Sequence, residues 1–316
     1  MMRADFVIVG LPASGKTTFL AALWHLVEAG EEECRLKLGS YEGDLTYLNK
    51  IAEAWRSFQP VPRTSQVGDA NVTLELVDQN TNARATAFFP DLAGETFDAQ
   101  VEARRCRPEL IDSIAEDDGV LLFVSADVKG DGLSIIELNA MMPPDISALG
   151  KEGLPVAAAT EAAETNDAQE RAVAPAGQVT EPSDPVAKRV EWEPKMLPSQ
   201  VRVVQILSDM LRAPFEPRRR RLAVIISAWD LTKGMNLTPN DWLASQMPLV
   251  DQFLKTNTPS FDYAIYGVSA QGVSLSDEVA VGNAAKLTPS RRIHIEGPDG
   301  EGHDLTSPLV WLMSAR

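Results

Sequence analysis

A glycine-rich segment between residues 10 and 17 has the residue types and spacing of a phosphate-binding loop. Gly10 is followed at fixed spacing by Gly15, Lys16 and Thr17, with an apolar run before the segment and a helical pattern after it. Successive backbone N–H groups in such a loop bind phosphate oxygens, and the following helix directs its positive dipole end toward them. Lys16 supplies a cation to the outer phosphates, and the Thr17 hydroxyl suits Mg²⁺. The predicted phosphate-binding residues are Gly10, Pro12, Ala13, Ser14, Gly15, Lys16, Thr17 and Thr18.

An acidic box stands at the end of a later predicted strand. Its sequence, Asp91-Leu-Ala-Gly94-Glu95, resembles the D-x-x-G box of GTPases. In that family the aspartate holds Mg²⁺ through water and the glycine N–H contacts the terminal phosphate. The resemblance implies these roles for Asp91 and Gly94, and it implies that the loop after them is a switch that orders when this phosphate is present.

Two further boxes indicate recognition of a base. Ser227-Ala-Trp-Asp230 occupies the place of the [N/T]-K-x-D box of GTPases, and Ser269-Ala270-Gln271 resembles their S-A-K box. Asp230 would accept hydrogen bonds from guanine N1–H and the exocyclic amine, a donor pair that adenine lacks. Ser227 stands where Asn or Thr is usual and Ala228 where Lys is usual, so an ordinary aspartate that caps a turn is the alternative.

The boxes follow the order found in GTPases over nearly the whole chain. The segment 17–24 (T-T-F-L-A-A-L-W), the D-L-A-G-E box and the closing D-L-T-x-P-L-x-W-L narrow the resemblance to an uncharacterised bacterial group of the TRAFAC class, called double-GTPase-type. Such proteins are predicted components of bacterial conflict, or defence, systems, often beside a second GTPase. The resemblance implies a molecular switch that binds GTP with Mg²⁺ and acts on a protein partner.

Three residues are candidates for hydrolysis besides Lys16 and Gly94. Thr64 lies just before a predicted hairpin, where a threonine of the first switch normally ligates Mg²⁺, and Arg63 is placed as a cis arginine that neutralises transition-state charge. Glu95 stands where many relatives carry a water-orienting Gln or His. Because a carboxylate there would lie near phosphate charge, we expect slow hydrolysis.

Two other functions fit part of the pattern. The loop L-P-A-S-G-K-T-T also resembles those of small-molecule and nucleotide kinases, although the hairpin and the D-x-x-G box favour the switch. A nucleotide-bound scaffold that does not hydrolyse its ligand is the second alternative, motivated by Pro12, Glu95 and Ala228.

Composition narrows the setting of the protein. The 316 residues carry a formal net charge of −16, which argues against binding nucleic acid or an anionic membrane. Cys34 and Cys106 are expected to be reduced thiols, and the three histidines show no metal spacing. The arginines of residues 218–221 are expected to be solvated or paired with carboxylates. No targeting or membrane-spanning segment is evident, so a cytoplasmic protein is expected.

The apolar patterns predict alternating strands and helices. Strands are expected over 4–9, 71–77, 84–90, 119–125, 222–227 and 262–268, and helices over 16–29, 43–58, from 199, over 239–255 and near Pro308. The short link between the second and third strands makes them a hairpin. These elements predict an α/β fold of the three-layer P-loop type, with a mostly parallel sheet and one antiparallel edge hairpin strand.

Residues 151–198 differ in composition from the rest. Ala, Glu, Pro and Thr dominate, and residues 157–190 contain no Leu, Ile, Phe or Trp. Such a stretch buries too little apolar surface to offset its chain entropy. We predict one GTPase-like domain over 1–316 with a disordered acidic insertion at 151–198.

Overall fold

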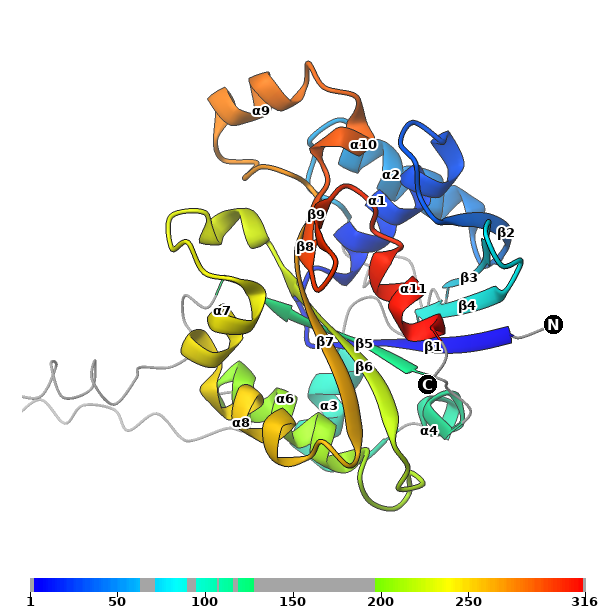
Figure 1. Ribbon diagram of the computed structural model, residues 1–316, viewed down its shortest axis with the longest axis vertical. Helices are drawn as coiled ribbons and strands as arrows, with labels where there is room; N and C mark the ends of the chain where they lie inside the picture. The colour runs from blue at the N-terminus through cyan, green and yellow to red at the C-terminus, as the bar shows by residue number, and fades with distance from the viewer. Residues whose placement is uncertain are drawn as a thin grey trace, which may run out of the picture. The chain divides into compact units, whose positions relative to one another are not determined.

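The computed structural model describes residues 3–62, 72–89, 95–106, 108–115, 119–127 and 197–314. Within these residues, nine strands form a single sheet in the order β2-β3-β4-β1-β5-β6-β7-β8-β9 (Figure 1). The strands are β1 (Arg3–Gly10), β2 (Leu36–Glu42), β3 (Val72–Asp78), β4 (Arg84–Phe89), β5 (Gly119–Ser125), β6 (Arg220–Ser227), β7 (Phe261–Ser269), β8 (His294–Gly297) and β9 (Gly300–Gly302).

The central five strands of the sheet are parallel. β1 pairs in parallel with both β4 and β5, and β6 and β7 continue in the same direction. β3 pairs antiparallel with β4, which is the hairpin that the sequence predicts. The α/β class with a mostly parallel sheet is thereby confirmed. Because the chain places its next parallel strands on opposite sides of β1, a ligand is expected at the carboxyl end of this strand.

Helices cover both faces of this sheet (Figure 1). They are α1 (Lys16–Ala29), α2 (Leu45–Arg56), α3 (Glu95–Ala103), α4 (Pro108–Ala115), α6 (Ser199–Asp209), the 3-10 helix η4 (Trp229–Thr232), α7 (Pro239–Gln246), α8 (Pro248–Thr256), α9 (Glu278–Ala284), α10 (Pro289–Arg292) and α11 (Ser307–Met313).

Alternation along β1 shows how the two faces are built. Phe6 and Ile8 pack into a core shared with α1, α2 and α11, whereas Val7 and Val9 pack into a second core shared with α3, α6, α7 and α8. Successive side chains of a strand point to opposite faces of the sheet, so β1 supplies apolar residues to both cores. The continuous apolar runs of the parallel strands therefore reflect burial on both sides.

The sheet extends beyond the predicted strands at both edges. β2 pairs antiparallel with β3, with a register shift between Leu38 and Ser40, and β8 and β9 form an antiparallel hairpin beside β7. The helix predicted over 239–255 is two helices, because Met247 leaves the helical conformation and Pro248 begins a new helix. Ser199 is the first residue of α6, with Pro198 rather than Ser199 at the N-cap position.

Residues 151–196 of the predicted insertion lie outside the described residues, so the insertion and the single-domain organisation stay predictions. Of the helices that the structure describes, none is long and apolar enough for a membrane crossing.

Candidate functional site

The predicted phosphate loop joins β1 to α1 at the carboxyl edge of the sheet. The Ser14 N–H donates to the Leu11 carbonyl at 3.3 Å, and Ala13 and Gly15 adopt left-handed φ angles of 59° and 89°. A Cβ atom on Gly15 would lie 2.7 Å from the side chain of Ser227. A glycine at this position therefore lets the loop rest directly against the end of β6.

Lys16 begins α1 and points back into the loop. Lys16 is only 2% exposed, and its Nζ donates to the carbonyl oxygens of Gly10 at 2.8 Å and Leu11 at 2.9 Å. Backbone carbonyl dipoles thus help to hold the buried ammonium within the curve of the loop. The same curve holds the N-terminal end of α1, so a cation and a helix dipole meet where phosphate oxygens would bind.

Asp230 lies in η4, directly after β6, and is held by a residue from β7. Ser269 is 1% exposed, and its Oγ donates to Asp230 Oδ1 at 2.6 Å, while the Gly272 N–H donates to Ser269 Oγ at 3.2 Å. Ala228 adopts a left-handed φ of 54° at the turn between β6 and η4. The two boxes predicted to read a base are therefore joined by a direct hydrogen bond.

A cavity of about 310 Å³ connects the phosphate loop to these base-reading boxes. Phe19 and Phe123 contribute apolar wall, and their rings pack edge to face 5.1 Å apart. An apolar cleft with a few polar groups at its ends has the form of a small-molecule site. Of the predicted residues, the cavity is lined by Ala13, Gly15, Thr18, Ser227, Asp230 and Ala270.

The end of α2 supports the far wall of this cavity. Trp55 Nε1 donates to the Ala270 carbonyl at 2.9 Å, and Gln271 Nε2 donates to the Trp55 carbonyl at 3.2 Å. The Arg292 guanidinium lies over the Trp55 ring, 4.5 Å from its centre, and over the Phe58 ring at 4.1 Å. Burial lowers the pKa of Arg292 to about 10, so the guanidinium is still charged at neutral pH and remains a cation–π partner.

Sequence analysis missed this contribution of α2 and of the segment after it. Gln59 and Val61 line the cavity, as do Val273 and Leu275 beyond the S-A-Q box. For Trp55 the sequence predicts only that it belongs to a helix over 43–58. A buried indole N–H does need an acceptor, which is the signal that could have suggested a second role.

A smaller cavity of about 260 Å³ opens on another side of the phosphate loop. Pro12, Ala13 and Ser14 line it together with Ser199 and Arg202 of α6. Five of the eight residues predicted for the phosphate loop therefore border one or the other of the two cavities: Pro12, Ala13, Ser14, Gly15 and Thr18. A sixth, Gly10, accepts a hydrogen bond from Lys16.

The predicted switch residues cannot be placed. Arg63, Thr64, Asp91 and Gly94 lie outside the described residues, and Glu95 is described only as the first residue of α3. Their roles in metal binding and hydrolysis stay predictions.

A strand, a phosphate-binding loop and a helix at the reversal point of a parallel sheet define a P-loop nucleotide-binding fold. Within that class, the chain belongs to the Double-GTPase 1 family, whose profile matches residues 7–312. The family match covers both the phosphate loop and the base-reading boxes.

Several solved structures resemble the chain at low identity. A bacterial selenocysteine-specific elongation factor, EF-Sec, is 11% identical with a TM-score of 0.33, over 90% of this chain and 28% of that one. The S. cerevisiae Ski7 GTPase-like domain bound to GTP is 8% identical with a TM-score of 0.37, over 86% of this chain and 44% of that one. Era from Aquifex aeolicus bound to GDP.AlF4- is 14% identical with a TM-score of 0.33, over 92% of this chain and 58% of that one.

The chain thus spans from 28% to 58% of the length of these three proteins. No curated protein matches the sequence. Because these TM-scores are low, the assignment to the Double-GTPase 1 family rests on the family match and not on the solved structures.

Proposed function

We propose that this protein is a guanine-nucleotide switch, which binds GTP with Mg²⁺, hydrolyses it slowly to GDP and couples the nucleotide state to a protein partner. One observation carries the proposal: a single cavity runs from the phosphate loop to an aspartate oriented by Ser269. The Double-GTPase 1 family match supports the choice of nucleotide.

In this proposal the phosphates bind the loop of residues 10–18. Backbone N–H groups at the start of α1 and the Lys16 ammonium bind the phosphate oxygens. Lys16 Nζ now donates to two loop carbonyls, so it would exchange these acceptors for phosphate oxygens when the nucleotide binds. The exchange keeps a buried cation paired in both states.

Guanine recognition is assigned to Asp230. One carboxylate oxygen accepts from Ser269, which orients the group to accept from guanine N1–H and the exocyclic amine. Ser227 and Ala270 border the same cavity, on the phosphate side and the base side. Adenine would leave a carboxylate without donors, so ATP is rejected.

Mg²⁺ would be held by the Thr17 hydroxyl, with Thr64 and, through water, Asp91 as its other ligands from the chain. A cation bound there would neutralise phosphate charge. Gly94 would contact the terminal phosphate, Arg63 would neutralise charge that develops in the transition state, and Glu95 would orient the attacking water. A carboxylate in the last role favours a slow reaction.

The partner is proposed to be a protein, and the family resemblance suggests a second GTPase-like protein in a bacterial defence system. A switch acts through the differential affinity of its partner for two nucleotide states. The partner assay is therefore a pull-down with GTPγS-loaded and GDP-loaded protein, which should differ severalfold in the amount of partner retained.

The nucleotide is tested by competition. Labelled GTP with Mg²⁺ is bound to the purified chain and displaced by unlabelled GTP, GDP or ATP, with Lys16→Ala as the loop control. We expect GTP and GDP to displace half of the label at concentrations at least 100-fold lower than ATP requires. Lys16→Ala should lose binding of the labelled GTP. Equal displacement by ATP would overturn guanine recognition, and unchanged binding in Lys16→Ala would overturn the phosphate site.

A further inference from the structure

We propose that a second cavity, beside the β8–β9 hairpin, binds an arginine or lysine side chain from a basic segment of a partner protein. This cavity, called the acidic cavity below, measures about 330 Å³ and shares no lining residue with the nucleotide cavity. It lies between the hairpin, the loop after α1 and the start of α11. Its lining includes Glu32, Glu33, Tyr266, Asp299, Glu301 and Asp304.

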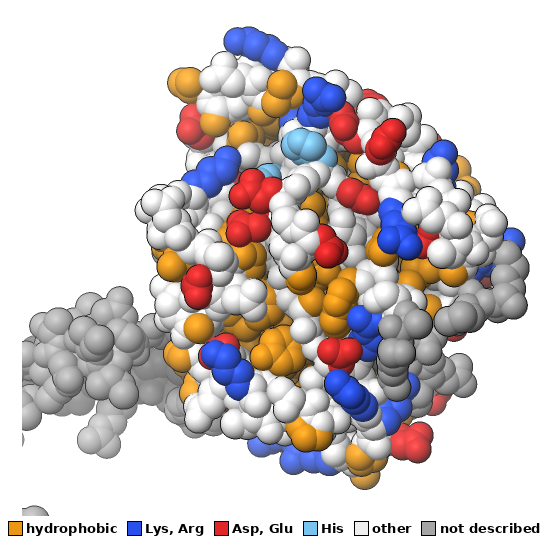
Figure 2. Space-filling view, viewed as in Figure 1, with side chains coloured by type: hydrophobic (Ala, Val, Ile, Leu, Met, Phe, Trp, Pro, Cys, Tyr) orange, Lys and Arg blue, Asp and Glu red, His pale blue; other side chains and the backbone are white. Residues whose placement is uncertain are grey.

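The charge of the acidic cavity is of one sign. Five of its lining side chains are carboxylates, and no lysine or arginine is among the lining residues that the structure describes. Figure 2 shows acidic side chains gathered over the β8–β9 region. Glu33, Asp299 and Glu301 are exposed to solvent at the cavity. Such a concentration of negative charge raises the local concentration of cationic groups.

Two of the carboxylates are held in place by the fold. Asp304 accepts from the backbone N–H groups of Arg35 at 3.0 Å and Thr306 at 2.8 Å, and Glu32 pairs with Arg291 at 2.5 Å. These contacts fix part of the wall, while Glu33 and Asp299 remain at the opening to meet a ligand. The cavity is therefore a partly rigid site rather than a cluster of freely moving side chains.

A buried hydroxyl without a partner lies in the lining of the acidic cavity. Tyr266 is 1% exposed, and within the described residues its Oη has no hydrogen-bond partner. Burial and the charge of Asp299 raise the pKa of this phenol, while Arg221 lowers it, so the group is neutral at physiological pH. A buried polar group without a partner is costly, and a ligand N–H would provide one.

The hairpin contributes closely packed glycine backbone to the wall besides the side chains of Asp299 and Glu301. A Cβ atom on Gly297 would lie 2.3 Å from a ring carbon of Tyr266, so this position admits only glycine without a shift of the ring. Gly300 and Gly302 also line the cavity. The ligand therefore meets five carboxylates and one phenol oxygen, which accept hydrogen bonds, beside His303 and Ser307.

These features favour an arginine or lysine side chain over other ligands. The five carboxylates and the Tyr266 hydroxyl oxygen can accept from N–H donors, and the exposed acids at the opening suit neighbouring basic residues of a peptide. Nucleic acid and acidic peptides would be repelled. A free polyamine offers similar donors but no chain beyond the cavity, so the experiment separates it from a protein segment.

The charge is tested with a fluorescein-labelled hexa-arginine peptide, whose binding to the full-length protein is followed by fluorescence anisotropy. Asp299→Asn should weaken binding about tenfold, which corresponds to the loss of one ion pair. The matched control is Glu278→Gln, which removes the same charge from α9, outside the cavity, and should change affinity less than twofold. Equal losses in both variants would mean general electrostatic attraction and would overturn the site.

The phenol gives a test that charge cannot mimic. Tyr266→Phe keeps the ring against Gly297 and removes only the unpaired hydroxyl, so the melting temperature should stay the same or rise. Peptide affinity should nevertheless fall about fivefold. Unchanged affinity in a folded Tyr266→Phe protein would overturn the proposal, as would spermidine competing as well as the peptide. The proposal stands apart from nucleotide binding, because neither variant touches the nucleotide cavity.

Discussion

The Asp230 carboxylate must accept hydrogen bonds from two partners, Ser269 and the base of the nucleotide. One oxygen is engaged by Ser269 at 2.6 Å, and the group must still accept from the base. Asp230→Asn replaces an acceptor with an amide N–H₂, which repels the guanine donors and suits the carbonyl at position 2 of xanthine. We expect GTP affinity to fall about 100-fold and XTP affinity to rise by a similar factor. A competition titration with the two nucleotides measures both changes.

The matched control for this change is Asp241→Asn, at the exposed start of α7, where the side chain accepts from Thr238. It should leave both affinities within twofold of the original protein. If Asp230→Asn weakened GTP and XTP alike, the aspartate would be a structural cap and not a base-reading residue.

Gly15 is required for steric reasons as well as for its backbone conformation. Gly15 and Gly30 both have positive φ angles, but a Cβ on Gly15 would meet Ser227 at 2.7 Å, whereas Gly30 has open space around it. Gly30→Ala should lower the free energy of unfolding by about 1 kcal/mol through backbone strain alone. Gly15→Ala should lower it by about 3 kcal/mol, because a clash adds to the strain. Urea unfolding measures the free energy lost in each variant. Equal losses in Gly15→Ala and Gly30→Ala would refute the clash with Ser227.

At the scale of elements, the phosphate loop depends on local sequence and the base site does not. The loop, β1 and α1 are contiguous, so spacing and periodicity predict them together. The hydrogen bond from Trp55 to Ala270 joins residues 215 positions apart. Periodicity places Trp55 on a buried face, but only the packed helix shows which carbonyl its indole N–H meets.

Two of the elements that sequence analysis missed, β8 and β9, share a physical cause. β8 and β9 are short and contain Gly297, Gly300 and Gly302, and glycine weakens the strand pattern. The arginines of residues 218–221 follow the expectation in part, because Arg219 is exposed and Arg221 pairs with Asp262 at 3.7 Å. Arg220 is fully buried and donates to the Met210 carbonyl at 3.0 Å and to the Glu216 carbonyl at 3.1 Å, so this arginine is not solvated as the sequence suggests. Backbone carbonyls as partners for a cation leave no mark in a sequence.

The α2 end gives an element-scale prediction for the nucleotide site. Trp55→Phe keeps an aromatic ring beneath Arg292 and removes only the N–H that holds the Ala270 carbonyl. The loop at the base side of the cavity should loosen, and GTP affinity should fall about tenfold. The measurement is a GTP titration of the folded variant.

Trp24→Phe is the matched control for this prediction. Trp24 lies in the same core, and its Nε1 donates to Asn49 Oδ1 at 3.3 Å, away from the base-reading loop. Both variants should lose similar stability, but Trp24→Phe should bind GTP normally. Equal losses of affinity would attribute the effect to general weakening of the core and not to the Trp55 contact.

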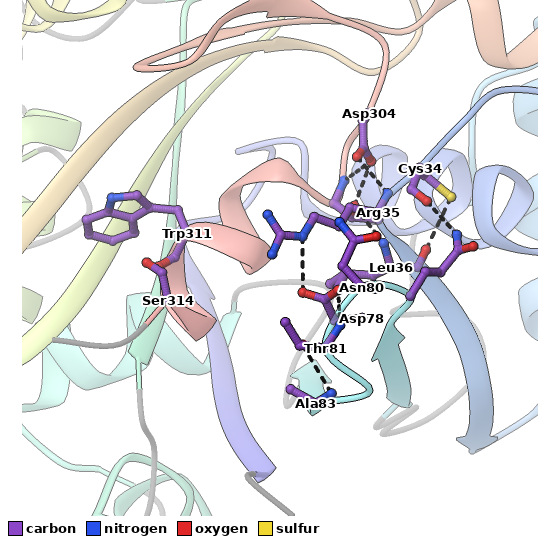
Figure 3. A network of polar contacts seen from close by, with 12 residues as sticks. Cys34, Arg35, Leu36, Asp78, Asn80, Thr81, Ala83, Asp304, Trp311 and Ser314 are labelled. Carbon is purple, nitrogen blue, oxygen red and sulfur yellow. Dashed lines mark hydrogen bonds and ion pairs between the residues drawn. The ribbon is translucent and has the colours of Figure 1, made fainter.

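At the scale of the whole molecule, a polar network joins the start of β2 to the turn after β3 and to the segment before α11 (Figure 3). The Arg35 side chain donates from Nε to Asp78 Oδ2 at 3.0 Å, and the Arg35 backbone N–H donates to Asp304 Oδ2, also at 3.0 Å. The Leu36 N–H donates to Thr306 Oγ1 at 3.3 Å, just before α11. The β3–β4 turn, the strand β2 and the last helix are thus fastened at one place.

Asp78 makes this network sensitive to acid. Burial raises the pKa of its carboxyl, but hydrogen bonds from the Asn80 N–H, the Arg35 side chain and the Thr81 N–H, together with the charge of Arg35, outweigh burial and lower it overall. A group whose pKa is depressed by folding stabilises the protein above its unfolded pKa, and this stabilisation is lost as pH falls through the folded pKa. The loss should therefore appear below about pH 4, where an unfolded aspartate begins to take up its proton.

Asp78→Asn tests whether the fold depends on this charge. At pH 7 the variant should lose about 2 kcal/mol of unfolding free energy, since it weakens hydrogen bonds to a buried charge. As pH falls from 5 to 3 its stability should change less than that of the original protein, so the two curves converge. Asp277→Asn, which removes the charge of an exposed N-cap confined to α9, is the control and should run parallel to the original curve. Parallel curves for Asp78→Asn as well would place the acid sensitivity elsewhere among the carboxylates of this strongly acidic chain.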